Sequence, residues 1–138
     1  MDTMGTHVLF EFWGCDVKFL ATPRRVEEAI VEAVKATGAT VVKTFVQKFG
    51  THRDNPPAGV SGVVVLAESH LSIHTWPEYG YASVDVYTCG TCRPLEARDV
   101  LVRSFRARTV ESLTIARGLS EKASLGPADS VNRLSFDN

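Results

Sequence analysis

The sequence predicts an α+β fold, in which an antiparallel β-sheet carries two helices on one face as a two-layer α/β sandwich. Strand-like and helix-like segments follow one another in the order β-α-β-β-β-β-α-β. Few of the connections force a parallel crossover, and both helical segments carry one apolar stripe. The length of 138 residues fits one domain with a buried core.

The composition is that of a globular protein, with 44% hydrophobic and 22% charged residues. A net charge of −1 gives no basis for nucleic-acid binding. No stretch approaches the roughly 18 apolar residues of a membrane span, and no export signal is evident, so we expect neither membrane insertion nor export. The odd count of three cysteines indicates free thiols in a reducing cytoplasm.

The first strand and the first helix have clear signals. Residues 7–13 alternate, and their apolar face consists of Val8, Phe10 and Phe12. Glu11 points the other way, toward solvent or a cleft, and is a candidate substrate-binding residue. The helix begins with Thr22 as the cap and Pro23 at the first position, and Gly38 suits its end. Its apolar stripe consists of Val26, Ala29, Ile30, Ala33 and Val34.

The middle of the chain is predicted to form four strands, at residues 40–49, 62–67, 71–76 and 81–88. Residues 77–80 form a turn, because proline fixes φ and glycine tolerates positive φ. If this hairpin pairs Trp76 with Tyr81, then His74 lies opposite Ser83.

A second amphipathic helix is predicted over residues 94–105, with Leu95, Val100, Leu101 and Phe105 facing inward. Residues 108–116 then form the last strand. We expect one domain over residues 1–118. The tail, residues 119–138, is polar and weakly periodic, and we expect it either to fray or to lie along a neighbouring subunit.

Chemistry-bearing side chains occupy the ends of consecutive predicted strands. The run that ends at Ala67 is followed by Glu68-Ser69-His70, His74 lies in the next strand, and Cys89 ends the one after it. A hydroxyl, an imidazole and a thiol can therefore converge.

Simpler interpretations exist for each of these residues. A serine at a strand end is usually only a satisfied hydroxyl, and a lone cysteine is more often a small buried hydrophobe. His70 and His74 could form a metal pair with Cys89-x-x-Cys92, but a zinc site normally shows a cleaner second pair, so we expect no metal. A cysteine hydrolase built on Cys89 and His74 would lack an evident oxyanion-hole motif.

Residues 59–90 resemble the processing region of prokaryotic-type S-adenosylmethionine decarboxylase proenzymes, which are pyruvoyl-dependent. The segments ESH, HTWPEYGYA and TCG are in register within this block. The resemblance extends to Gly5-x-His7, Glu11-Phe12-x-x-Cys15-Asp16 and Gly38-Ala39-Thr40, and it fades after Cys92.

The resemblance implies a self-cleaving chain. Ser69 would attack the carbonyl of Glu68, and β-elimination would then separate a β chain, residues 1–68, from an α chain that starts at residue 69. The covalent cofactor would be a pyruvoyl group made from Ser69, which forms a Schiff base with a substrate amine and accepts electrons as carbon dioxide leaves.

The resemblance also assigns roles to single residues. His74 would transfer protons during self-processing, and Ser61 would hydrogen-bond near the scissile carbonyl. Cys89 would be the general acid that reprotonates the substrate carbon. Glu78 would bind the ribose hydroxyls of the substrate, and Phe49 would stack on its adenine.

The expected reaction is decarboxylation of S-adenosylmethionine to the aminopropyl donor for spermidine. The sequence departs from the family pattern at Gln47, in an inserted segment at residues 50–55, at residues 91–93 and at Ala116. These departures keep L-arginine and L-ornithine open as substrates. A guanidinium or ammonium group could pair with Asp54, although Asp54 and its neighbours could equally be solvated loop residues.

Two further expectations concern partners. A sheet with helices on one side leaves an apolar face, which a second copy of the chain would cover, so we expect a homodimer or a higher homo-oligomer. The resemblance also implies self-association, with active sites near the subunit interface. A non-catalytic binding or regulatory relative is the remaining alternative. It is disfavoured because all five processing and catalytic positions are present together: Ser61, Glu68, Ser69, His74 and Cys89.

Overall fold

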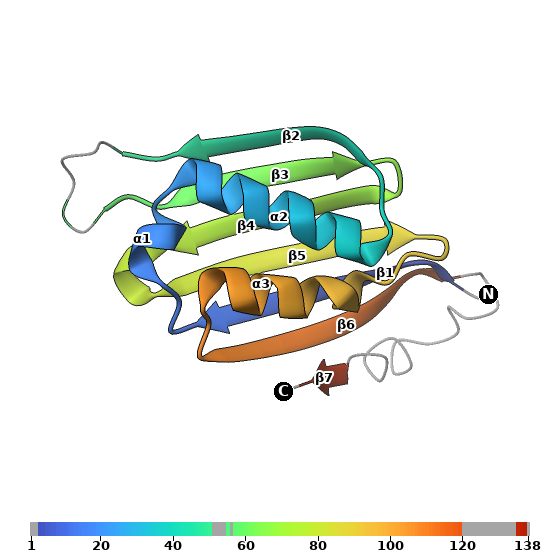
Figure 1. Ribbon diagram of the computed structural model, residues 1–138. Coiled ribbons are helices and arrows are strands. Elements are labelled where there is room, and N and C mark those ends of the chain that lie inside the picture. Colours follow the sequence, from blue (N-terminus) through green and yellow to red (C-terminus); the bar gives the residue numbers. More distant parts are fainter. Residues whose placement is uncertain (1–2, 51–54, 56, 120–134, 138) are drawn as a thin grey trace.

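The computed structural model describes residues 3–50, 55, 57–119 and 135–137, and within them an antiparallel sheet backs a layer of helices (Figure 1). The sheet has seven strands in the order β2-β3-β4-β5-β1-β6-β7. Their bounds are β1 Thr3–Trp13, β2 Val41–Lys48, β3 Val60–Leu66, β4 Ser69–Trp76, β5 Tyr81–Cys89, β6 Thr109–Leu119 and β7 Ser135–Asp137. The predicted α+β sandwich is therefore confirmed.

The helices all lie on one face of the sheet (Figure 1). They are α1 Val17–Leu20, α2 Pro23–Thr37 and α3 Ala97–Phe105, with single 3₁₀ turns η1 Pro77–Tyr79 and η2 Pro94–Glu96. No helix among the described residues is long and apolar enough to cross a membrane.

The core lies between α2, α3 and the sheet. Phe10 and Phe12 of β1 are fully buried, and the ring of Phe12 meets that of Phe105 edge-on at 5.4 Å between centroids. The predicted stripe of α2 is buried in full. Burial of these large side chains is the main source of stability that the sequence supplies.

The ends of α2 follow the prediction with one difference. Pro23 is the first residue, and Gly38 ends the helix with a φ of 84°, which glycine adopts without strain. Thr22 is the cap residue, but its hydroxyl donates to the carbonyl of Lys18 at 2.6 Å instead of accepting from the first turn. The short helix α1, which precedes it, was not predicted because four residues carry no periodic signal.

One side chain of the predicted second helix faces the wrong way. Leu95 was expected to point inward, but 38% of its surface is exposed. Residues 94–96 form a 3₁₀ turn with about three residues per turn, so Pro94 and Ala97 take the buried positions. Leu101 and Phe105, further along α3, are buried as expected.

The predicted central hairpin is confirmed residue by residue. Trp76 pairs with Tyr81 and His74 with Ser83, and the turn closes at Gly80 with a φ of 61°. Because side chains alternate along a strand, this register fixes which residues share the face of the sheet that no helix covers.

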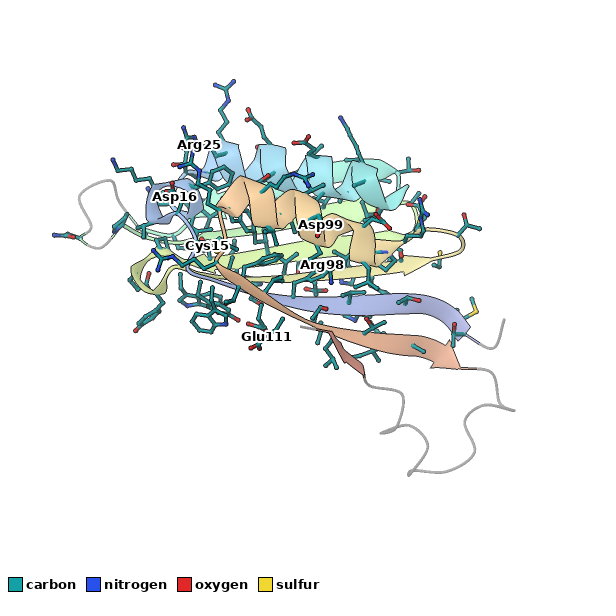
Figure 2. All side chains as sticks on the ribbon, turned by 60° about the horizontal axis from the view of Figure 1, so that its bottom comes forward. Cys15, Asp16, Arg25, Arg98, Asp99 and Glu111 are labelled. Carbon is teal, nitrogen blue, oxygen red and sulfur yellow. The ribbon has the colours of Figure 1, made fainter. Side chains whose placement is uncertain are left out.

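That uncovered face, which we call the open face, carries the polar and aromatic side chains. Glu111 of β6 projects from it, away from the helices (Figure 2). The rings of Trp13 and Trp76 stack on either side of Tyr81, at 4.3 and 5.1 Å.

Parts of two predicted segments lie outside the described residues. They include residues 51–54 of the inserted segment, with Asp54, and residues 120–134 of the tail. Residues 135–137 of the tail form β7, which pairs with β6 at the sheet edge.

Candidate active site

The bond predicted to be cleaved lies in the tight connection between β3 and β4. The carboxylate of Glu68 accepts hydrogen bonds from the backbone N–H of Thr40 at 2.9 Å and from its hydroxyl at 3.1 Å. The backbone bond from Thr40 is the main reason why the pKa of Glu68 is lowered. These contacts anchor the residue that precedes the predicted cleavage point.

Ser69 has an unusual backbone. Its φ is 151°, in a region that residues with a side chain rarely adopt. The carbonyl of Glu68 accepts the backbone N–H of Cys89 at 3.2 Å. A strained residue with a polarised carbonyl before it is the kind of local arrangement that functional sites retain.

The hydroxyl of Ser69 contacts an imidazole that the sequence did not single out for processing. Ser69 Oγ lies 3.2 Å from His70 Nδ1, and His70 Nε2 lies 3.0 Å from an Asp85 carboxylate oxygen. Asp85 belongs to β5, two residues from the position opposite His70. The three side chains form one continuous hydrogen-bonded line.

Asp85 is the centre of this network. It also accepts hydrogen bonds from the hydroxyl of Ser72 and from Nε2 of His7, the latter at 2.7 Å. Burial alone would raise the pKa of Asp85, but the hydrogen bonds from Ser72, His7 and His70 outweigh it, and the pKa is lowered. Asp85 is therefore a carboxylate at neutral pH.

Arg117 of β6 extends the network. Its Nη1 donates to Nδ1 of His7 at 3.1 Å, and its guanidinium lies 4.4 Å from the ring centre of Tyr87. Of the side chains in this network, His70 contacts Ser69 directly, whereas His7 and Arg117 lie further along it and are connected to His70 through Asp85.

A second group of predicted residues surrounds a cavity of about 220 Å³ near the other end of β4. Ser61 Oγ lies 2.8 Å from Nδ1 of His74. Four predicted site residues line this cavity together with Trp76: Phe49, Ser61, His74 and Glu78.

The two groups do not meet within one chain. Ser69 and His74 are five residues apart on β4, which corresponds to about 17 Å along a strand. The backbone N–H of Cys89 contacts the carbonyl of Glu68, next to Ser69. His74 does not join them in the same chain, and convergence of the Ser69 hydroxyl with the Cys89 thiol stays a prediction.

Glu11 lies apart from both groups. Its carboxylate accepts a hydrogen bond from the hydroxyl of Tyr81, and it lines a small cavity of about 170 Å³ between β1 and β6. In the sheet it pairs with Ser83, which in turn pairs with His74, so β5 lies between Glu11 and the 220 Å³ cavity.

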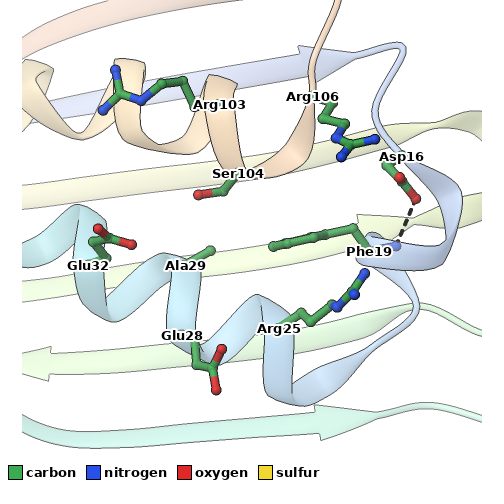
Figure 3. Close-up of a pocket in the computed structure, with 9 residues that line it drawn as sticks. All are labelled: Asp16, Phe19, Arg25, Glu28, Ala29, Glu32, Arg103, Ser104 and Arg106. Atoms are coloured by element: carbon green, nitrogen blue, oxygen red, sulfur yellow. Dashed lines mark hydrogen bonds between the residues drawn. The ribbon is translucent and has the colours of Figure 1, made fainter.

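A larger depression of about 440 Å³ lies on the helix layer (Figure 3). Residues of α1, α2 and α3 and their caps line it, and Arg25 lies over the ring of Phe19 at 5.9 Å. None of the predicted site residues lines this depression.

One group among the described residues has the donor atoms for a metal ion. The nearest ligand atoms of His7, His70 and Asp85 lie within 4.8 Å of one another. His74, which the sequence suggested as a partner of His70, is not part of this group, because four residues of extended strand, about 13 Å, separate the two histidines.

The three cysteines are free. Cys15 is buried, and burial raises the pKa of its thiol to about 12. Cys89 is exposed at the end of β5. The pKa of Cys92 is raised, first by burial and then by the nearby charges of Glu68 and Cys89.

Sequence reasoning missed the pairing of His70 with Asp85, although a signal for it was present. The predicted register of the hairpin places Ser72 opposite Asp85 and His70 opposite Tyr87. His70 and Asp85 then lie on the same face of the sheet, as a diagonal cross-strand pair. Arg117 could not be found in this way, because its contact depends on the pairing of β1 with β6.

The chain is similar to proteins of a known family. The family model described as S-adenosylmethionine decarboxylase matches residues 6–118. An S-adenosylmethionine decarboxylase proenzyme from Anoxybacillus flavithermus is 44% identical over 119 residues, which are 86% of this chain and 91% of the relative. The proenzyme from Shouchella clausii is 44% identical over 136 residues, covering 98% and 96% of the two chains.

Solved structures show the same architecture. The crystal structure of the adenosylmethionine decarboxylase from Aquifex aeolicus superposes with a TM-score of 0.75 at 34% identity, covering 91% of this chain and all of that one. A monomer of the Trypanosoma brucei AdoMetDC gives a TM-score of 0.55 at 14% identity, covering 92% of this chain and 55% of that one, and shares the fold alone. The chain therefore belongs to the S-adenosylmethionine decarboxylase family.

Proposed function

We propose that the chain is the proenzyme of a pyruvoyl-dependent S-adenosylmethionine decarboxylase, which cleaves itself between Glu68 and Ser69. Its product is the aminopropyl donor used for spermidine. The proposal rests on the backbone geometry at the Glu68–Ser69 bond. Ser69 has a positive φ and the Glu68 carbonyl accepts a backbone N–H, within a chain that matches the family over residues 6–118.

The first step converts a peptide bond into an ester. Oγ of Ser69 forms a bond to the carbonyl carbon of Glu68, the bond to the backbone nitrogen breaks, and that nitrogen takes a proton. The N–H of Cys89, 3.2 Å from the carbonyl oxygen, stabilises the negative charge that develops there. Release of the strained backbone at Ser69 favours the same step.

The second step breaks the chain. Loss of the proton on Cα of Ser69 expels the ester oxygen, which leaves as the new carboxylate of Glu68. Water then replaces the nitrogen, and ammonia departs. The residue that was Ser69 becomes the pyruvoyl end of the α chain. Its Cβ takes up a proton to become the methyl group, its ketone oxygen comes from water, and its former Oγ stays on the carboxylate of Glu68.

The pyruvoyl group supplies an electrophilic ketone, which accepts the amine of the substrate and takes up the electron pair left by carbon dioxide. Cys89 holds the proton that replaces carbon dioxide on the substrate carbon. Its thiol is exposed, and its backbone already contacts the residue before Ser69.

The substrate is S-adenosylmethionine, and the cavity beside His74 supports this. Phe49 offers an exposed ring for the adenine, and Glu78 offers a carboxylate for the ribose hydroxyls. The relatives described above are named for S-adenosylmethionine, which disfavours L-arginine and L-ornithine.

A second copy of the chain completes the site. Ser69 with Cys89 and His74 with Ser61 lie about 17 Å apart on one strand, far beyond hydrogen-bond reach. In our proposal two copies pack with their open faces together, related by a two-fold axis that crosses β4 near its middle, and this places the Ser69 end of one strand over the His74 end of the other. Each homodimer then contains two sites, and each site draws on both chains.

The open face has the character of such an interface. Four large apolar side chains expose more than a third of their surface on it: Trp13, Phe45, Val65 and Trp76. Phe45 exposes 59% of its surface. Apolar side chains gathered on one face of a sheet are typical of a surface that another protein covers.

Release of carbon dioxide from three carboxyl-labelled substrates tests the proposed function. S-adenosylmethionine, L-arginine and L-ornithine are incubated in parallel with the wild-type protein, and Ser69→Ala is the control. We expect release from S-adenosylmethionine alone and none from Ser69→Ala. Release from arginine or ornithine, or equal release by the control, would contradict the proposal.

A further inference from the structure

We propose that His70 is the general base that activates Ser69 for self-cleavage, and that Asp85 positions it. The inference deepens the proposed function, because it rests on cleavage between Glu68 and Ser69. Three contacts support it: Ser69 Oγ to His70 Nδ1 at 3.2 Å, His70 Nε2 to Asp85 at 3.0 Å, and the Glu68 carbonyl to the N–H of Cys89 at 3.2 Å.

The hydrogen-bond partners decide which nitrogen of His70 carries the proton. Asp85 is a carboxylate and can only accept, so Nε2 of His70 donates to it. In the neutral imidazole the other nitrogen, Nδ1, is then a bare acceptor. It faces the hydroxyl of Ser69, which donates to it.

The two histidines that contact Asp85 differ in what their second ring nitrogen faces. Arg117 can only donate, so Nδ1 of His7 accepts from it, and Nε2 of His7 donates to Asp85. Both imidazoles therefore hold their proton toward Asp85. Only His70 turns its free nitrogen toward the nucleophile.

Each atom in the step is accounted for. The proton on Oγ of Ser69 moves to Nδ1 of His70 as the Oγ–C bond to Glu68 forms. Asp85 stabilises the resulting imidazolium through the Nε2–H bond, and the N–H of Cys89 stabilises the oxyanion. The C–N bond then breaks as the nitrogen of Ser69 takes the proton from His70, and His70 returns to its starting state.

This assignment gives His70 a role distinct from that of His74. His74 lies about 17 Å along β4 from Ser69 and contacts Ser61. It cannot accept the Ser69 proton within the same chain. His70 is the next residue after Ser69, so every copy of the chain carries nucleophile and base together.

The test follows self-cleavage of the full chain after cell-free synthesis, by denaturing mass spectrometry over time. His70→Ala removes the base, and His70→Gln keeps a donor for Asp85 but cannot take up a proton. General bases contribute about 10²–10⁴-fold, so we expect both variants to cleave at least about 100-fold more slowly. Added imidazole should speed the cleavage of His70→Ala but not that of His70→Gln, because only the former leaves space beside Ser69.

His7→Gln is the matched control, because His7 contacts the same carboxylate oxygen of Asp85 without touching Ser69. We expect it to cleave within about threefold of wild type, whereas Asp85→Asn should slow cleavage and be insensitive to imidazole. Cleavage of His70→Gln at the wild-type rate would overturn the proposal.

Two further outcomes distinguish the role of His70 as a base from metal binding and from failure of the proposed function. Equal losses in the His7, His70 and Asp85 variants, together with loss of cleavage in a chelator, would show that the three residues bind a metal and would overturn the proton relay. If the wild-type chain itself stays uncut, self-cleavage does not occur, and the proposed function fails whatever the role of His70.

Discussion

Mixing two inactive variants tests whether one active site draws on two chains. His74→Ala removes the imidazole beside Ser61, and Ser69→Ala removes the nucleophile. Within one chain these positions are about 17 Å apart, whereas a proton transfer requires heavy atoms within about 3.2 Å. Ser69→Ala has no nucleophile in either chain, and His74→Ala has no His74 in either chain for the proton transfer expected of it, so we expect each variant alone to remain uncut.

The size of the recovery follows from pairing statistics. In a mixed dimer, one site combines the intact Ser69 of the His74→Ala chain with the intact His74 of the other chain, and the second site lacks both. With equal amounts and random pairing, about half of the His74→Ala chains are in mixed dimers. Close to half of them should therefore cleave, and none of the Ser69→Ala chains should.

Co-expression with two different tags, followed by denaturing mass spectrometry of each chain, measures these fractions. Homodimers of each variant, expressed alone, are the controls. Normal cleavage of His74→Ala alone would show that His74 is not required, and an uncut mixture would show that the two positions do not meet between chains. Either result refutes the shared site.

Four further predictions concern single residues. Cys89→Ala should still cleave, because the backbone N–H that contacts the Glu68 carbonyl remains, but it should lose most turnover of S-adenosylmethionine, as measured by carbon dioxide release. Phe12→Ala should lower the free energy of unfolding by about 3–5 kcal/mol in denaturant titration, because Phe12 is fully buried against Phe105. Cys15 should resist alkylation at pH 8 in the folded protein, since its pKa is about 12 and the thiolate is the reactive form; rapid labelling would contradict its burial. The folded protein lowers the pKa of Asp85 below its usual value of 3.8, so the Asp85 carboxylate stabilises the fold above pH 3.8, and this stabilisation is lost as the pH falls through the folded pKa. Asp85→Asn should therefore have a lower melting temperature than wild type at pH 7, and the difference should shrink in acid.

Much of the fold could be predicted because its signals are local. The hairpin register followed from a proline–glycine turn, and the stripe of α2 followed from helical spacing. Leu95 was misplaced because a 3₁₀ turn changes the phase of the pattern, which sequence spacing alone does not reveal. Strand β7 has three residues, too few for an alternating pattern to stand out.

The site was predicted less completely, for a different reason. The block that contains Ser69 and His74 identifies the residues but not the distance between them, which depends on both being on one extended strand. The contact between His70 and Asp85 follows from the hairpin register. The contact between His7 and Arg117 joins positions 110 residues apart, and no local pattern encodes it.

The central claim is that Ser69 becomes a new chain end by breaking its own backbone. The intact mass of the purified wild-type protein under denaturing conditions tests this most directly. We predict two fragments that divide between residues 68 and 69, the second of them with no free N-terminal amine and with a mass that corresponds to a pyruvoyl end. A single polypeptide that still contains Ser69 after prolonged incubation would contradict the account.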